Sequence, residues 1–317
     1  MEGLTPDFFK EAWKVRRANF NDEIRFFAPN LKHYETSEFK SEPVPRFVAV
    51  SVTGGVCALR CKHCGGEILK SMLDASTPEA LRSLGEELFE KGCRGILLSG
   101  GSSRDGRVPL GDFLPVAKDL KARFGFRITA HTGLVDRTLA GQFLKSGIDS
   151  VMIDVIGSDE TIREIYGLDS TVGDIARSLE ELSRLHIPTT PHVVAGLHFG
   201  KILGEYEALS IISRHRKNLK SLVIVAFSPL RGTAMEKVEP PAPEEVARLI
   251  VRARLLFPEH ELFLGCARPI GKKHEILDSF ALRAGVNGIA YPADGLAKEA
   301  TELGLAPRFY PTCCSVA

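Results

Sequence analysis

Short apolar runs separated by stretches with the pattern of helices limit the fold more than any other feature of the sequence. The runs are rich in β-branched residues and span residues 47–55, 95–101, 126–133, 150–157, 189–197, 221–229, 260–268 and 285–292. Unbroken runs of this kind are typical of parallel strands that are covered on both faces. Eight strand–helix units in about 250 residues match the size of a (β/α)8 barrel. We therefore predict an α/β fold, a TIM-type barrel that is complete or partial, with a doubly wound open sheet as the alternative.

The ends of the chain lie outside the predicted strands. Apolar residues recur with helical spacing between Phe8 and Val15, which predicts an amphipathic helix packed on the outside or bottom of the barrel. We expect one domain, in which an N-terminal helical extension spans 1–45, the barrel spans 46–300 and a tail spans 301–317. Within the barrel, Thr77 and Pro78 predict the start of a helix that ends before Gly92.

Charge and hydropathy narrow the class of protein. Lys and Arg total 41 against 40 for Asp and Glu, a net charge of +1, which gives no electrostatic case for binding nucleic acid or an anionic membrane. No run of 18 apolar residues suggests a membrane-spanning helix. Charged residues also stand where a signal peptide needs its apolar stretch. We expect a cytoplasmic protein with no nucleic-acid or membrane partner.

The cysteines point to metal chemistry. An odd number, seven, with no export signal is a poor disulfide framework. Cys57, Cys61 and Cys64 form a C-x3-C-x2-C motif on the loop after the first predicted strand, at the end of a barrel where active sites lie. Three thiolates could hold three irons of a [4Fe–4S] cluster and leave the fourth iron open. A structural zinc or a structural cluster is the alternative, and Cys93 is expected to be a small buried apolar side chain.

This loop resembles the signature of the radical S-adenosylmethionine (SAM) superfamily. The resemblance implies that Cys57, Cys61 and Cys64 bind the cluster and that its open iron binds the amino and carboxylate groups of SAM. One electron would then cleave SAM to methionine and a 5′-deoxyadenosyl radical, which abstracts hydrogen from an unactivated carbon. The residue before the last cysteine, usually aromatic in this superfamily, is His63.

Further motifs agree with the resemblance. Gly100 and Gly101 stand where the superfamily has a Gly-Gly-Glu motif that meets the SAM amino group, although Ser102 replaces the glutamate. Asp154 resembles a fourth-strand residue that contacts SAM ribose or substrate in biotin-synthase-like members. The segment with Gly196 and His198 resembles the glycine-rich segment beside adenine. The plain alternatives are a loop-capping carboxylate for Asp154 and turn geometry for the glycines.

Two histidines stay without a role. His131 and His192 lie in predicted strands, and with His198 they could line the mouth of the barrel. Histidines with ordinary partners inside a barrel are the equal alternative, so we name none of them as catalytic.

The remaining cysteines suggest a second iron–sulfur cluster. Cys266 ends the seventh predicted strand, and Cys313 and Cys314 precede the C-terminus. If the tail folds over the barrel mouth, the three thiols could meet there, with Arg268, Ser315 or an external ligand in the fourth position. Incidental thiols on a frayed tail are the alternative.

At a finer level the chain resembles the biotin-synthase-related branch, and within it the second component of the archaeal-type two-component lipoyl synthase. This resemblance rests on SVTGGVCALRCKHCGGEIL and the terminal CCSV. It implies sulfur insertion at C6 or C8 of an octanoyl chain on a lysine of a lipoyl-domain protein, with sulfur supplied by a sacrificial auxiliary cluster. The implied partners are a second radical SAM component and an electron donor such as ferredoxin or flavodoxin.

Two other functions stay open. One is a carbon-skeleton rearrangement or C–C bond formation like that of methylornithine synthase, without sulfur transfer. The other is a non-catalytic protein with a structural zinc at residues 57–64. The colour of anaerobically purified protein distinguishes them, because an iron–sulfur protein is brown and a zinc protein is colourless.

Overall fold

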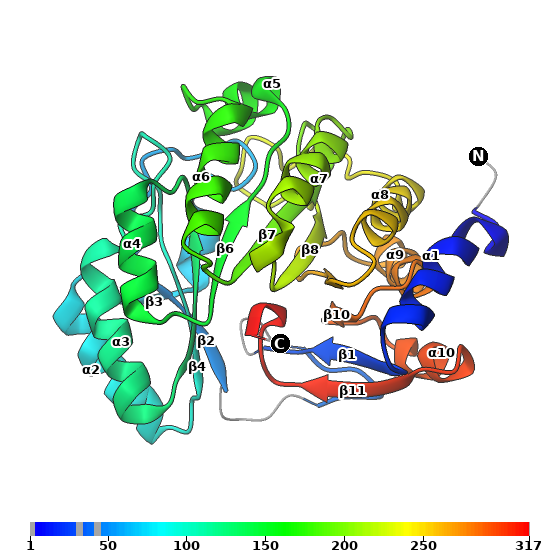
Figure 1. Cartoon of the computed structure of the whole chain (residues 1–317), viewed down its shortest axis with the longest axis horizontal. Helices are drawn as coiled ribbons and strands as arrows, with labels where there is room; N and C mark the ends of the chain where they lie inside the picture. Colours follow the sequence, from blue (N-terminus) through cyan, green and yellow to red (C-terminus); the bar gives the residue numbers. More distant parts are fainter. Residues whose placement is uncertain (1–3, 30–33, 41–45, 317) are drawn as a thin grey trace.

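The structure, a computed structural model, describes residues 4–29, 34–40 and 46–316 and is built around one curled parallel sheet (Figure 1). The strands are β1 (Glu23–Phe27), β2 (Phe47–Ser51), β3 (Leu73–Asp74), β4 (Gly95–Ser99), β5 (Arg127–Thr132), β6 (Ser150–Asp154), β7 (Thr189–Ala195), β8 (Ser221–Ala226), β9 (Glu261–Leu264), β10 (Gly288–Ala290) and β11 (Ala306–Tyr310). Their order across the sheet is β11-β1-β10-β9-β8-β7-β6-β5-β4-β2-β3. In the described part of the chain, no pairing joins β3 to β11, so the barrel is open along one side.

Helices cover the outer face of the curl (Figure 1). They are α1 (Pro6–Asn19), α2 (Pro78–Glu90), α3 (Leu114–Phe124), α4 (Arg137–Ser146), α5 (Asp159–Thr161), α6 (Val172–Arg184), α7 (Glu205–Arg214), α8 (Pro243–Leu256), α9 (Lys272–Arg283) and α10 (Leu296–Glu302). Short helical turns are η1 (Glu67–Ser71), η2 (Gly111–Phe113), η3 (Ile162–Tyr166), η4 (Arg216–Asn218) and η5 (Cys314–Val316). Each of the predicted strands is present, which confirms the α/β fold as a partial barrel.

Helix α2 begins at the Thr77–Pro78 pair, as the sequence predicted. The Thr77 hydroxyl accepts a hydrogen bond from the Ala80 amide at 3.1 Å, and Pro78 is the first residue of the helix. The chain leaves this helix through Gly92, whose φ of 89° lies in the left-handed region. Cys93 follows, fully buried as predicted, with its thiol 3.3 Å from the Gly95 carbonyl oxygen.

The N-terminal segment contributes more than the helix predicted for residues 1–45. The amphipathic helix is present as α1, and it packs on the outside, with the ring of Phe9 5.6 Å from that of Phe280 in α9. The same segment also supplies β1, which lies between β10 and β11 in the sheet. Ile24, Phe26 and Phe27 of β1 are buried, so this strand is part of the core.

The C-terminal segment, predicted as a tail over the barrel mouth, instead extends the sheet and then enters its interior. Residues 306–310 form β11, which pairs in parallel with β1. The chain then turns inward through η5, which contacts β5, β6 and β10, and Figure 1 shows this turn near the middle of the molecule. Cys313 through Val316 are all buried, because the two sides of the open barrel enclose them.

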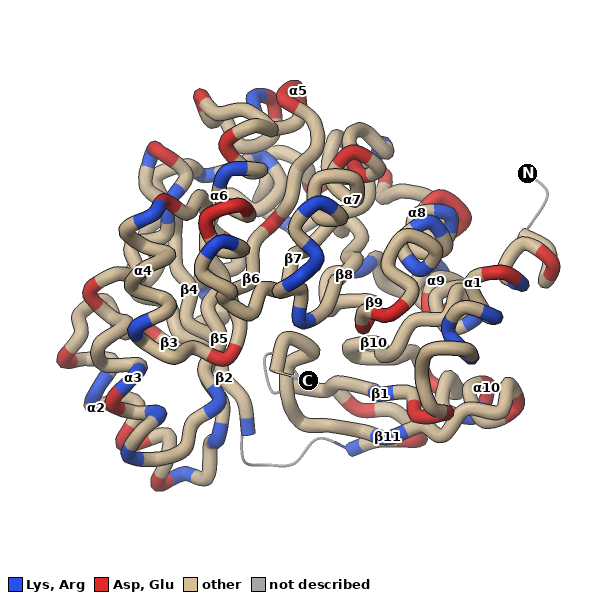
Figure 2. Tube along the Cα trace, viewed as in Figure 1, with Lys and Arg blue, Asp and Glu red and all other residues tan. Residues whose placement is uncertain are grey.

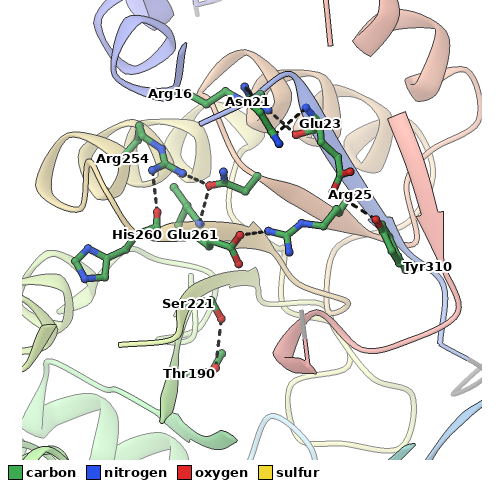
Figure 3. Close-up of polar contacts among 12 residues, drawn as sticks. Arg16, Asn21, Glu23, Arg25, Thr190, Ser221, Arg254, His260, Glu261 and Tyr310 are labelled. Atoms are coloured by element: carbon green, nitrogen blue, oxygen red, sulfur yellow. Dashed lines mark hydrogen bonds and ion pairs between the residues drawn. The ribbon is translucent and has the colours of Figure 1, made fainter. Parts of the chain in front are cut away.

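Two buried arginines bind backbone oxygens of the turns that lead into β1 and β9 (Figure 3). Arg254 of α8 is fully buried and donates to the backbone oxygen of His260 at 2.9 Å and to the side-chain oxygen of Asn287. Arg16 of α1 donates to the backbone oxygens of Asn21 and Glu23 at 2.8 and 2.7 Å. These partners satisfy most donors of two guanidinium groups that would be costly to bury alone, and Nε of Arg16 is buried without a partner among the described residues.

Charged side chains of both signs alternate along the outer helices (Figure 2), in keeping with the net charge of +1. Among the described residues, no helix combines the length and the apolar character that crossing a bilayer requires.

Candidate active site

A cavity opens at the carboxyl ends of β2, β4, β5 and β6. Six residues predicted for the site line it: Cys57, Cys61, Cys64, Gly100, Gly101 and Asp154. Most of the remaining lining is apolar and includes Leu69, Met72, Val108 and Ile156. The sequence motifs therefore converge on one place, at the end of the sheet where barrel enzymes keep their active sites.

The loop after β2 folds so that two of its thiols adjoin. The amides of Cys64 and Gly65 donate to the carbonyl oxygen of Cys61 at 3.1 and 2.7 Å, which forms a tight turn. Gly65 and Gly66 both have positive φ, of 55° and 83°, a conformation that a side chain would strain. Glycine after the last cysteine thus allows the turn that brings Cys61 beside Cys64.

The contact between Cys61 and Cys64 favours loss of the proton from one of the two thiols. A hydrogen bond from Cys61 lowers the pKa of the Cys64 thiol to about 4, and the same contact raises the pKa of Cys61. The thiolate is the form that binds metals, and thiolates suit iron–sulfur clusters. With Cys57 on the same cavity wall, the donor set fits a cluster held through three irons.

Gly101 packs directly against the cysteine loop. A Cβ atom built on Gly101 would lie 1.9 Å from the backbone oxygen of Val56 and 2.6 Å from Cα of Cys57. The Gly101 amide donates to the Thr53 hydroxyl at 2.7 Å, and the Ser102 carbonyl accepts from the Ala58 amide at 2.8 Å. The second glycine of the motif is therefore needed for close approach of two backbones, and Ser102 contributes its carbonyl oxygen to the loop.

Asp154 lies within a polar cluster at the inner face of the sheet. Its carboxylate Oδ1 is 3.3 Å from Nε2 of His131, and the ligand atoms of these two residues and His192 lie within 4.8 Å of one another. Burial alone would raise the pKa of Asp154, but the neighbouring His131, with smaller contributions from His192 and His63, lowers it to about 2. Burial and the charge of His131 lower the pKa of His192 to about 4, so His192 is neutral at physiological pH.

Tyr166 is a site residue that the sequence analysis did not find. It lines the cavity from η3, and its ring centre is 5.2 Å from that of His63. Its hydroxyl is buried and has no hydrogen-bond partner among the described residues. A buried hydroxyl without a partner is costly, so this group is poised to bond to a ligand in the cavity. Nothing in the local sequence marks this tyrosine, because its position depends on how η3 packs.

Gly196 and His198 do not line this cavity. Gly196 has a φ of 75°, and a Cβ there would lie 2.6 Å from the ring of Pro241. Nδ1 of His198 is 3.2 Å from the hydroxyl of Thr161 in α5, and Nε2 is 3.6 Å from Glu160. The glycine thus serves turn geometry and close packing, while His198 ties the loop after β7 to a helix that borders the cavity.

The other three predicted cysteine ligands form a second group, in which Cys266 and Cys313 are both near Cys314. Cys313 and Cys314 are buried in the interior, whereas Cys266, just after β9, is exposed. The pKa of the Cys314 thiol is raised by its hydrogen bond with Cys313, by burial and by the nearby charges of Cys313 and Cys266. The hydroxyl of Ser315 donates to the sulfur of Cys313 at 3.2 Å.

The Arg268 side chain is surrounded by hydrogen-bond and ion-pair partners within the fold. Its Nε is 2.9 Å from the carboxylate of Asp278, and its Nη2 donates to the carbonyl oxygens of Ala290 and Tyr291 at 2.6 and 3.0 Å. The Arg268 and Asp278 side chains are almost wholly buried, with 2% and 0% exposed. The guanidinium is thus occupied by partners that hold the loop after β9 against β10.

Comparison with known proteins agrees with the geometry. The sequence profile of the radical SAM superfamily matches residues 51–201, which contain the three-cysteine loop, Gly100, Gly101 and Asp154. Residues 51–201 of the chain are therefore similar to the radical SAM superfamily. This match ends before Cys266, so it covers the first cysteine group and not the second.

Proteins of similar sequence include biotin synthases. That of Campylobacter hominis is 25% identical over 248 residues, which cover 75% of this chain and 73% of that protein. A 7,8-didemethyl-8-hydroxy-5-deazariboflavin synthase of Methanoculleus marisnigri is 25% identical over 223 residues, 64% of this chain and 65% of the other.

Solved structures share the fold. Methylornithine synthase superposes with a TM-score of 0.64 at 15% identity and covers 97% of this chain and 91% of its own. The FeFe-hydrogenase maturase HydG from Carboxydothermus hydrogenoformans gives a TM-score of 0.65 at 15% identity, covering 97% of this chain and 73% of its own.

Similarity to this superfamily implies that the site would hold a [4Fe–4S] cluster and SAM. When bound, they supply a carbon radical that removes hydrogen from unactivated carbon. The chain's own part is to orient the cofactor and to keep water away from it, and the largely apolar lining of the cavity suits the second task.

Proposed function

We propose that this radical SAM enzyme inserts sulfur into a protein-bound octanoyl chain and acts as one component of a lipoyl synthase. Cys57, Cys61 and Cys64 bind the SAM cluster in this proposal, and Gly100, Gly101 and Asp154 border the SAM site. The relationship to biotin synthases supports a role in sulfur insertion. The observation that carries the proposal is the placement of Cys313 and Cys314 inside the barrel.

The second cysteine group has the chemistry of a metal site. Cys313 and Cys314 share a hydrogen bond, and the Cys266 thiol is close enough to affect the pKa of Cys314. Three thiols near one another are the ligand type that iron–sulfur clusters use. In our proposal they hold an auxiliary iron–sulfur cluster that supplies the sulfur, and Ser315 beside Cys313 is a candidate for the fourth position.

The two cysteine groups are connected through the polar cluster of the inner face. Cys313 is near enough to His131 to raise the pKa of that imidazole, and His131 contacts Asp154 on the cavity wall. A carbon chain in the cavity would therefore lie between the first thiol group and the second. An apolar lining suits an octanoyl chain, because each buried methylene contributes about 0.8 kcal/mol.

The substrate in this proposal is a lipoyl-domain protein with an octanoyl-lysine. A lysine arm carries its acyl chain on a long flexible stem, which can reach a cavity at the end of a barrel. A second radical SAM component and an electron donor of the ferredoxin or flavodoxin type complete the reaction.

The test is an anaerobic assay with SAM, reductant and an octanoyl-lysine peptide, with mass spectrometry of the peptide. It is run with and without a second radical SAM component. The reconstituted chain is expected to hold about eight irons, from two clusters of the four-iron type. The variant with Cys266, Cys313 and Cys314 replaced by Ala should retain SAM cleavage and lose sulfur insertion. If this triple variant still adds sulfur, the proposed auxiliary cluster is wrong.

The exposure of Cys266 favours a second candidate, a carbon-skeleton rearrangement or C–C bond formation without sulfur transfer. An exposed thiol beside two buried ones is a less closed ligand set than a resident cluster ordinarily has. An iron content near that of one cluster, with no sulfide consumed on turnover, would support this candidate and exclude the first.

A further inference from the structure

Three potential metal ligands converge on the inner face of the sheet at neighbouring strands. Asp154, at the end of β6, pairs in register with His192 of β7. His131 of β5 pairs with Met152, two residues before Asp154, so His131 projects to the same face as Asp154. The imidazole and carboxylate ligand atoms of the three residues lie within 4.8 Å of one another.

The closest pair already has the spacing of two ligands on one ion. Two ligands about 2.0–2.1 Å from a zinc ion at a tetrahedral angle are about 3.3 Å apart. Nε2 of His131 and Oδ1 of Asp154 are 3.3 Å apart. A direct hydrogen bond would ordinarily be shorter, with a mode near 2.9 Å.

His192 is oriented as a ligand by its own strand. Nδ1 of His192 lies 3.1 Å from the backbone oxygen of Thr190. Because a carbonyl oxygen can only accept, Nδ1 carries the proton, and the neutral ring keeps its lone pair on Nε2. Metal-binding histidines are usually fixed in this way by a second partner on the other ring nitrogen.

We propose that His131, Asp154 and His192 bind a divalent transition-metal cation of the zinc or iron(II) class. Two imidazoles and one carboxylate are a common ligand set for such ions. His131 and Asp154 also line the cavity, so positions of the ion not taken by protein face the place where a substrate would lie. The site uses none of the cysteines, but it shares the cavity with the three-cysteine loop and with the reaction proposed above.

The test is zinc binding by the anaerobically reconstituted full chain, measured by equilibrium dialysis and elemental analysis. The unmodified chain is expected to bind one zinc ion more than the His192→Gln variant, or to bind it at least about tenfold more tightly. His215→Gln, at the C-terminal end of α7 and away from the cluster, is the matched control and should bind like the unmodified chain. Asp154→Asn provides a second variant should His192→Gln fold poorly, and circular dichroism checks the fold of each.

X-ray absorption at the zinc edge identifies the ligands. The proposal expects imidazole scattering that is lost in His192→Gln, with iron content equal in both proteins. Equal zinc binding in all variants, or zinc with sulfur ligands alone, would overturn it.

Discussion

The guanidinium of Arg127, at the start of β5, donates a hydrogen bond of 3.3 Å to the backbone oxygen of Val316. Lys220 donates similarly, at 3.3 Å, to the backbone oxygen of Ser315. Two cations at the amino ends of β5 and β8 therefore hold the turn that contains Cys314. The position of the second cysteine group depends on these contacts.

Loss of both cations should loosen the C-terminal turn. Hydrogen bonds from charged groups contribute about 1.5–3 kcal/mol each when buried, and less when partly exposed. We expect Arg127→Ala/Lys220→Ala to raise the rate at which Cys313 and Cys314 react with a thiol reagent by roughly tenfold or more. Mass spectrometry reads each cysteine separately. Lys121→Ala, which removes a cation that bonds to Gly147 and not to the turn, is the control. Unchanged labelling in the double variant would contradict the anchoring role.

Gly101→Ala should disrupt the three-cysteine loop. Its Cβ would overlap the backbone oxygen of Val56, so the loop must move, at a cost typical of overpacking, about 1–3 kcal/mol. We expect most of the cluster iron to be lost on reconstitution, measured by iron analysis and visible absorbance. Gly141→Ala in α4, where a Cβ meets nothing within 4 Å, should keep its iron. Full iron content in Gly101→Ala would show that the loop tolerates the shift.

Glu205→Gln should stabilise the protein at neutral pH. Burial raises the pKa of the Glu205 carboxyl above its ordinary value of 4.5, although the Gly196 amide donates to it at 2.7 Å. Because the folded chain binds this proton more tightly than the unfolded chain, stability falls as pH rises from the unfolded to the folded pKa and stays lower above it. Glutamine keeps the acceptor oxygen and removes the charge. Thermal unfolding should give a higher Tm for the variant at pH 7 and a smaller difference near pH 4.5.

The control for this effect is Glu207→Gln on the same helix, where the carboxylate is about half exposed. It should leave the Tm nearly unchanged across the same pH range. A Glu205→Gln effect that is equal at both pH values would rule out the titration of this carboxyl as its cause.

Arg254→Met should destabilise the fold strongly. The change removes the donor to the Gly285 and His260 carbonyl oxygens and one of the two donors to the Asn287 side-chain oxygen (Figure 3). Each buried acceptor left without a donor costs about 1–3 kcal/mol. Urea unfolding measures the loss. Arg252→Met, on the exposed side of the same helix, should change the free energy of unfolding by less than about 0.5 kcal/mol.

The strands that the sequence revealed are those covered on both faces. Strand β8 is buried at every position, so its sequence is a continuous apolar run. β11 is only partly buried and contains Pro307 and Arg308, and β1 contains Glu23 and Arg25, so neither gives such a run. These two strands are therefore recognised only in the structure, where each pairs with a neighbouring strand of the sheet.

The residues of the candidate site likewise include some that the sequence could identify and some that only the structure brings together. The three cysteines lie close together in the sequence, and the two glycines are neighbours in a second motif. The spacing within each motif alone indicated the chemistry. His131, Asp154 and His192 come together through the register of three strands, which the sequence does not show. Tyr166 depends on the packing of η3 and had no signal in the sequence.

The pairing of β11 with β1 joins residues 306–310 to residues 23–27, so two segments far apart in the sequence lie side by side. During translation β1 has only β10 as a neighbour until residues 306–310 leave the ribosome, and Cys313 and Cys314 emerge later still. The second thiol group can therefore be assembled only after β11 has become available to β1, so any metal it receives is delivered later than a metal at the three-cysteine loop could be.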